Sequence, residues 1–222
     1  MKQKTTPTQR ALNLWAVILI VWALYRTYFK MPSWFDEFVA KPLVFVLPVV
    51  YYIKNIEKKS VLSELYLKLK PKKIIEDVVY SLAVAVILVG SAALALSIRM
   101  KKPTLFVGPL PSTDYIISAV VLALATGITE EILSRGFVLK KLYDESKNMY
   151  SSIFLSSILF FFLHVPILFS DYRMVGNVLV GFILVDIMLS IINGYLFIQR
   201  KSLLMPILIH AFYNIIVAII FI

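Results

Sequence analysis

The sequence predicts an all-α protein: a polytopic transmembrane helical bundle of about seven spans, folded as a single domain over residues 1–222. Hydrophobic residues make up 60% of the chain, and the mean hydropathy is +0.84. Only 16% of the residues are charged, and they are grouped between long apolar runs. A helix of about 20 residues crosses the roughly 30 Å hydrocarbon core of a bilayer and pairs its own backbone groups there. No strand-like alternation of polarity, typical of membrane barrels, is present.

The expected spans follow from the apolar runs, at about 11–29, 35–53, 78–98, 112–142, 151–167, 174–198 and 203–222. The second is the weakest, because Lys41 and two prolines interrupt it, and we expect Lys41 to snorkel to an interface. The fourth begins at Ser112, a helix N-cap residue type. The segment 56–73 mixes leucines with lysines, which predicts a linker lying along the membrane surface.

The formal net charge of +10 would suggest nucleic acid in a soluble protein. Here the cations lie in short loops beside spans, where they set orientation and meet anionic headgroups. We therefore expect the lipid bilayer, and no nucleic acid, as partner. Alternate loops hold 15 and 7 lysines and arginines, which predicts a cytoplasmic N-terminus in the cell membrane. The chain has no cysteine, so thiolate chemistry is excluded.

Ionisable residues inside spans mark functional sites, and the fourth predicted helix carries three of them. Glu131 and Arg135 are four residues apart, so they share a helix face and are expected to pair. Glu130 lies about 100° round the helix and has no local partner. A buried carboxylate without a local partner is a candidate general base.

Both histidines of the chain also lie in apolar helices. The fourth and fifth helices are predicted to form a hairpin that turns near Glu145. This hairpin brings Glu130 and His164 to similar depths, within roughly 6 Å. His210 and Asn214 share one face of the last helix and require partners within the bundle.

Two chemistries fit this set of residues. A water activated by Glu130 and His164 can attack a peptide carbonyl, with His210 and Asn214 stabilising the oxyanion. Alternatively, Glu130, His164 and His210 form a His₂Glu zinc site with one open position. The H-E-x-x-H helix of many zinc proteases is absent.

The motifs Glu130-Glu131-x-x-x-Arg135, Phe160-x-x-x-His164 and His210-x-x-x-Asn214 lie in this order within residues 112–214. Together they resemble the signatures of the CAAX-protease and bacteriocin-processing (CPBP) family, which includes the type II CAAX prenyl protease. The resemblance implies an intramembrane endopeptidase of the glutamate type, favoured over a zinc enzyme, with no cofactor.

The family roles also map onto this chain. Glu130 and His164 would activate water, His210 and Asn214 would form the oxyanion hole, and Glu131 and Arg135 would be supporting residues. The expected partner is a membrane-associated peptide or lipidated protein substrate, with prenylated CAAX proteins as one candidate.

Two alternatives stay open: a non-catalytic membrane scaffold or bacteriocin-immunity protein of the same fold, and a small transporter using Glu130 and Asp186 as ion sites. Asp186, Asn177 and Asn193 lie outside the family motifs, and we expect structural roles for them.

Overall fold

The computed structural model describes residues 5–106, 108–170 and 176–220; the side chains of 167–170, 176–179 and 182 lie outside the described set, and with them Asn177. Every regular element within these residues is a helix, which confirms the all-α prediction. Six helical segments are long and apolar enough to cross a membrane, and α10 is a shorter apolar helix. The chain is an integral membrane protein. The principal helices are α1 (Pro7–Tyr28), α5 (Pro71–Met100), α6 (Thr113–Glu131), α7 (Lys140–Ser146), α8 (Met149–Ser170), α9 (Gly176–Arg200) and α10 (Leu204–Ile220).

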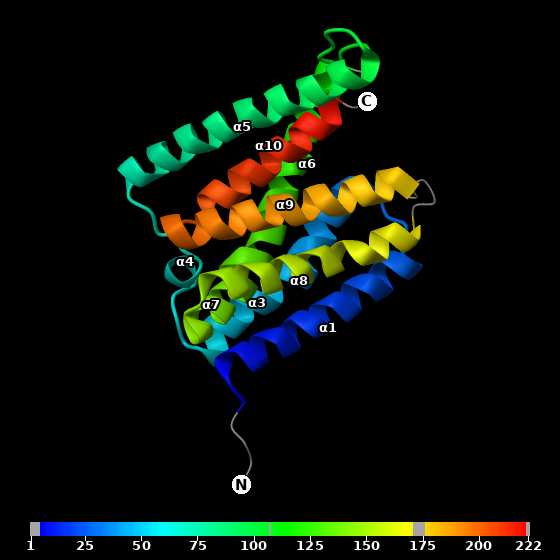
Figure 1. Cartoon of the computed structure of the whole chain (residues 1–222). Coiled ribbons are helices and arrows are strands. Elements are labelled where there is room, and N and C mark those ends of the chain that lie inside the picture. Colours follow the sequence, from blue (N-terminus) through cyan, green and yellow to red (C-terminus); the bar gives the residue numbers. More distant parts are fainter. Residues whose placement is uncertain (1–4, 107, 171–175, 221–222) are drawn as a thin grey trace.

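The helices form two layers (Figure 1). In the first layer α5, α10, α9, α8 and α1 lie side by side, each in contact with the next. The second layer holds α6 and the segment 33–56, with α6 packed along α10. The main apolar core fills the space where the layers meet, around Trp22, Phe45, Phe137, Phe160 and Phe197. The polar site described below is built into this same interior.

The weakest predicted span is a continuous helical segment, Ser33–Ile56, of 24 residues, long enough to cross. It alternates α-helical turns, α2 (Ser33–Phe35) and α3 (Leu47–Tyr51), with the π-helical turns η1 (Asp36–Ala40), η2 (Pro42–Val46) and η3 (Tyr52–Ile56). The expectation that Lys41 reaches an interface is wrong. Lys41 is only 6% exposed. It lies between two π-helical turns, and its side chain points inward and pairs with Glu37 and Glu130.

The segment 56–73 docks onto the protein, a contact that the prediction of a linker along the membrane surface did not include. The short helix α4 (Val61–Glu64) is followed by Leu65, which is 1% exposed and packed in the main core. Glu64 accepts hydrogen bonds from Lys141 at 2.7 Å and from Lys140 at 3.2 Å. These contacts hold the segment against α7, although Leu62 remains exposed.

Two local predictions hold. The Ser112 hydroxyl caps α6, accepting a hydrogen bond from the Tyr115 amide at 3.3 Å. The hairpin turns just after Glu145: α7 ends at Ser146, Lys147 adopts a left-handed backbone with φ of 55°, and α8 begins at Met149.

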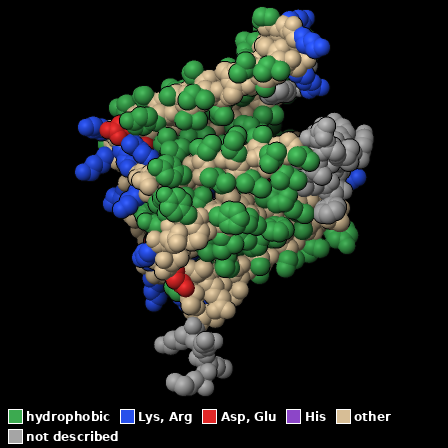
Figure 2. Space-filling model, in the orientation of Figure 1, with side chains coloured by type: hydrophobic (Ala, Val, Ile, Leu, Met, Phe, Trp, Pro, Cys, Tyr) green, Lys and Arg blue, Asp and Glu red, His purple; other side chains and the backbone are tan. Residues whose placement is uncertain are grey.

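The outer surface is largely hydrophobic, as a lipid-facing surface must be (Figure 2). Exposed aliphatic and aromatic side chains cover α1, α5, α8 and α9, whereas the lysines and arginines visible in this view gather at the ends of the molecule. This division matches a bundle whose long helices cross hydrocarbon and whose loops lie in the headgroup region.

Candidate active site

The site begins where α6 changes into a π-helical segment. Glu130 and Glu131 are the last residues of α6, and η4 (Ile132–Leu139) follows directly. The two carboxylates are 6% and 0% exposed. The Ser134 hydroxyl donates to the Glu130 carbonyl, satisfying a backbone acceptor where the helix widens. Such π-helical insertions occur often at functional sites.

Glu131 organises the residues around it through a single oxygen. Its Oε1 accepts hydrogen bonds from Arg135 Nη1 at 2.9 Å and from Asn193 Nδ2 at 3.1 Å, and His210 Nδ1 lies 2.9 Å away. An ionised carboxylate only accepts, so Nδ1 of His210 carries the proton in this contact. The predicted pairing of Glu131 with Arg135 is therefore present, and Asn193 has the structural role expected for it.

Glu130 uses its two oxygens differently. Its Oε1 accepts a hydrogen bond from Lys41 Nζ at 2.8 Å, and the same ammonium donates to Glu37 Oε1 at 2.6 Å. Glu130 has no local partner, as predicted, but it has a distant one, Lys41, which lies 89 residues away in the sequence. Lys41 was not assigned to the site from the sequence, although a lysine inside an apolar span is a signal that could have pointed to it.

The second oxygen of Glu130 faces both histidines. Its Oε2 lies 3.7 Å from Nε2 of His164 and 3.8 Å from Nε2 of His210. The Phe160 ring meets both imidazoles edge to face, at centroid distances of 4.9 and 6.0 Å. Three helices, α6, α8 and α10, thus converge on one carboxylate oxygen.

The other ring nitrogen of His164 is oriented by two acceptors. Nδ1 lies 3.3 Å from the Phe160 carbonyl and 3.6 Å from Asp186 Oδ2. Both acceptors favour a proton on Nδ1, which leaves the Nε2 lone pair directed at Glu130. Asp186, 8% exposed on α9, therefore borders the site, and its place outside the family motifs gave no indication of this contact.

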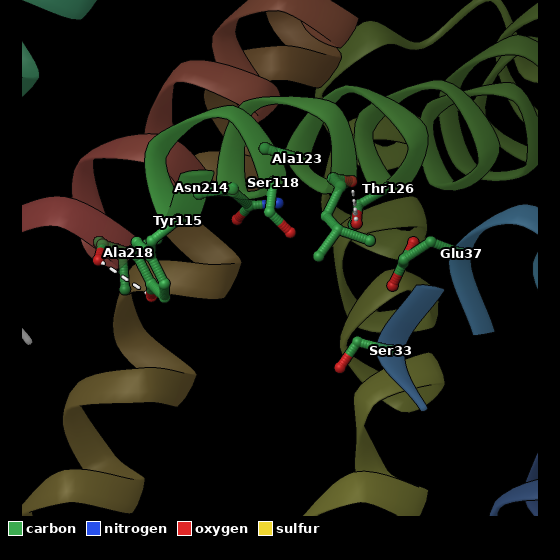
Figure 3. A pocket seen from close by; sticks show the side chains of 11 residues that line it. Ser33, Glu37, Tyr115, Ser118, Ala123, Thr126, Asn214 and Ala218 are labelled. Carbon is green, nitrogen blue, oxygen red and sulfur yellow. Dashed lines mark hydrogen bonds between the residues drawn. The ribbon is translucent and has the colours of Figure 1, made fainter. Parts of the chain in front are cut away.

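Asn214 lies one turn beyond His210 and lines a neighbouring cavity of about 340 Å³ (Figure 3). We call it the Glu37 cavity; its polar lining comprises Ser33, Glu37, Tyr115, Ser118, Thr126 and Asn214. The structure thus brings Glu130, His164, His210, Glu131 and Arg135 together, and it places Asn214 at the wall of the adjoining space.

The same donors were tested as a zinc site. Within the described part of the chain, no three His, Asp or Glu side chains are arranged to hold a metal ion. The Lys41 ammonium on Glu130 also opposes a divalent cation at this carboxylate, because like charges at 4 Å or less repel strongly in a low-dielectric interior. The residues as they stand do not fit zinc.

The comparison with known families concerns the part of the chain that contains these residues. Residues 112–216, a little under half of the chain, match the family described as type II CAAX prenyl endopeptidase Rce1-like. No curated protein and no solved structure matches the chain. The matched segment contains every motif residue named above, whereas Glu37 and Lys41 lie outside it. Over residues 112–216, the chain is similar to the Rce1-like family of type II CAAX prenyl endopeptidases.

Proposed function

We propose that this protein is an intramembrane endopeptidase that hydrolyses its substrate with a water molecule activated by Glu130 and His164. The similarity of residues 112–216 to the Rce1-like family supports an intramembrane endopeptidase in general. The observation that carries the mechanism is the convergence of His164 Nε2 and His210 Nε2 on Glu130 Oε2, at 3.7 and 3.8 Å. Separations just beyond direct hydrogen bonding are those that a bridging water fills.

The proposed reaction uses one carboxylate as base and then as acid. Glu130 Oε2 and His164 Nε2 each accept one hydrogen bond from the water, directing its oxygen lone pair at the scissile carbonyl. As the new C–O bond forms, the water proton passes to Glu130. Collapse of the tetrahedral intermediate breaks the C–N bond, and Glu130 returns the proton to the leaving amine.

His210 and Asn214 are the proposed oxyanion donors. The His210 Nδ1 proton is already directed at Glu131, so donation from Nε2 requires the doubly protonated ring. That imidazolium would form a buried ion pair with Glu131. The Asn214 amide, at the wall of the Glu37 cavity, would supply a second donor once substrate fills the space. Two such donors stabilise developing negative charge more than the neutral carbonyl.

The proposed substrate is a membrane-associated peptide or lipidated protein, with a prenylated CAAX peptide as the first to test. The second candidate function is a non-catalytic scaffold or immunity protein. It is disfavoured because burying a carboxylate base, two histidines and a lysine ammonium together is costly in a bundle. In the described structure Glu130 Oε2 is buried without a hydrogen-bond partner. A scaffold would gain no stability from such an unsatisfied oxygen.

The test is cleavage of a fluorogenic farnesylated CAAX peptide by purified protein in detergent. Glu130→Gln is expected to lower kcat by about 10²- to 10⁴-fold, the usual contribution of a general base. The control Asp114→Asn changes an exposed carboxylate on the same helix and is expected to keep wild-type activity. Each protein is assayed with and without a chelator. Loss in chelator would favour zinc, and equal rates for wild type and Glu130→Gln would overturn the mechanism.

A further inference from the structure

The Glu37 cavity adjoins the proposed catalytic residues on three separate segments. On α6, Thr126 lies four residues before Glu130; on α10, Asn214 lies four residues after His210. Residues four apart share a helix face. The cavity therefore begins one helical turn from the site, along the same helix faces, and Glu37 on the segment 33–56 lies at its wall (Figure 3).

Glu37 is the one charged side chain among the described residues that line this cavity. Its Oε1 accepts the hydrogen bond from Lys41, whereas its Oε2 is buried and has no hydrogen-bond partner. A buried acceptor without a donor is costly. Glu37 thus lines the cavity with a carboxylate whose Oε2 is enclosed and unsatisfied, and a rotation of its side chain would turn this oxygen toward a donor on a bound molecule.

The charges around the cavity and the site favour a positive ligand group. Four carboxylates face two cations, Glu37, Glu130, Glu131 and Asp186 against Lys41 and Arg135, which gives a net charge of −2 with both histidines neutral and of −1 with His210 as the imidazolium. In a low-dielectric interior this excess attracts an ammonium or guanidinium and repels a carboxylate.

The distance to the catalytic carboxylate fixes which substrate residue would reach Glu37. Lys41 Nζ lies 2.6 Å from Glu37 Oε1 and 2.8 Å from Glu130 Oε1, so these two oxygens are at most 5.4 Å apart. An extended peptide advances about 3.3–3.6 Å per residue. A side chain that meets Glu37 therefore belongs to a residue near the bond held at Glu130, and the two positions on either side of that bond are the first to test.

We propose that the Glu37 cavity is a substrate subsite. It takes an extended peptide segment and selects a lysine or arginine within two residues of the scissile bond, with Glu37 as the specificity-determining carboxylate. This inference rests on the endopeptidase function proposed above. It identifies a cationic segment as the feature of the substrate that is recognised. Glu37, the residue that recognises it, comes from the N-terminal half of this chain.

The experiment uses internally quenched peptides that share one hydrophobic anchor and one sequence. Lysine, glutamine or glutamate is placed in turn at each of the two positions on either side of the scissile bond. At one of these four positions, kcat/KM is expected to be about ten- to a hundredfold higher for lysine than for glutamate, the range of a charge-assisted hydrogen bond. Glu37→Gln is expected to lower this ratio of kcat/KM values between the lysine and the glutamate peptide. Glu57→Gln, a distant carboxylate that pairs with Lys141, is expected to keep it.

Equal rates for lysine and glutamate at all four positions, or an undiminished ratio in Glu37→Gln, would overturn the subsite. Glu130-dependent cleavage without such a preference would leave the endopeptidase function standing and remove only the subsite. If no peptide is cleaved, the proposed function fails, and fluorescence anisotropy of the same labelled peptides still tests the cavity. Tighter binding of the lysine peptide to wild type than to Glu37→Gln would then support the subsite, and equal binding to both proteins would refute it.

Discussion

Lys41 is the residue that most changes the description of the site. Its ammonium donates to Glu130 at 2.8 Å and to Glu37 at 2.6 Å, so it fixes one oxygen of the proposed base and one of the cavity carboxylate. With Oε1 engaged, Glu130 can turn only Oε2 toward the histidines. The ammonium also compensates two buried negative charges that would otherwise be expensive in this interior.

Replacing Lys41 tests this positioning role. Lys41→Met is expected to reduce kcat strongly and to destabilise the fold by about 3–5 kcal/mol, because it leaves buried carboxylates uncompensated. Lys41→Arg, which keeps the positive charge, is expected to recover part of the kcat and part of the stability. Lys30→Met, which removes an exposed lysine, is the control. Activity and thermal unfolding in detergent are measured together. Wild-type kcat in Lys41→Met would show that Glu130 does not depend on this contact.

At the scale of helices, the site depends on how closely α6 approaches α10. A Cβ built on Gly127 would lie 2.9 Å from the Ile207 carbonyl oxygen, closer than real contacts allow. This close approach places Glu130 and His210, on the two helices, within 3.8 Å of each other.

Gly127→Ala is therefore expected to force the two helices apart, costing about 1–3 kcal/mol of stability and lowering activity. The matched control is Gly90→Ala in α5, where nothing lies within 4 Å of the added Cβ. Melting temperature and peptide cleavage are compared for both variants. A Gly127→Ala protein as stable and active as Gly90→Ala would mean that the helix contact is not limiting.

The docked segment 56–73 has its own pH dependence. Burial raises the pKa of Glu64, but hydrogen bonds and charges from Lys141 and Lys140 outweigh it and lower the pKa from 4.5 to about 2. A folded-state pKa below the unfolded value contributes stability above pH 4.5 that is lost as the pH falls toward 2. The melting-temperature difference between wild type and Glu64→Gln is expected to shrink across this window. A constant difference would contradict the ion pairs.

At the scale of the whole molecule, hydropathy predicted the helices well because each span is a local property of the chain. Pairings between distant segments were harder to predict. Helical spacing identified the Glu131–Arg135 pair and the His210 face, but it does not report which helices are neighbours. Lys41 and Glu130 are 89 residues apart, and Asp186 meets His164 only through the contact of α8 with α9. The burial of Lys41, which was misread, and the docking of the segment 56–73, which was not predicted, both depend on such distant partners.

Orientation in the cell is the last property that the charges predict. In Figure 1 α1 and α5 run in the same direction, so the segment 33–56 must carry the chain back across the bundle between them. The cations agree with this path: Lys73 donates to the Arg200 carbonyl, and Lys141 pairs with Glu57, which gathers three lysine-rich segments at one end. By the positive-inside rule we expect that end to face the cytoplasm.

Because the chain has no cysteine, single-cysteine variants can test this orientation directly. Lys30→Cys and Lys102→Cys are expected to react with a membrane-impermeant maleimide on intact cells, whereas Lys72→Cys is expected to react only after permeabilisation. The reverse pattern would place the N-terminus outside. Labelling of positions 30 and 72 from the same side would mean that the segment 33–56 enters and leaves the membrane on one face, which would turn Lys41 and the Glu37 cavity toward that face as well.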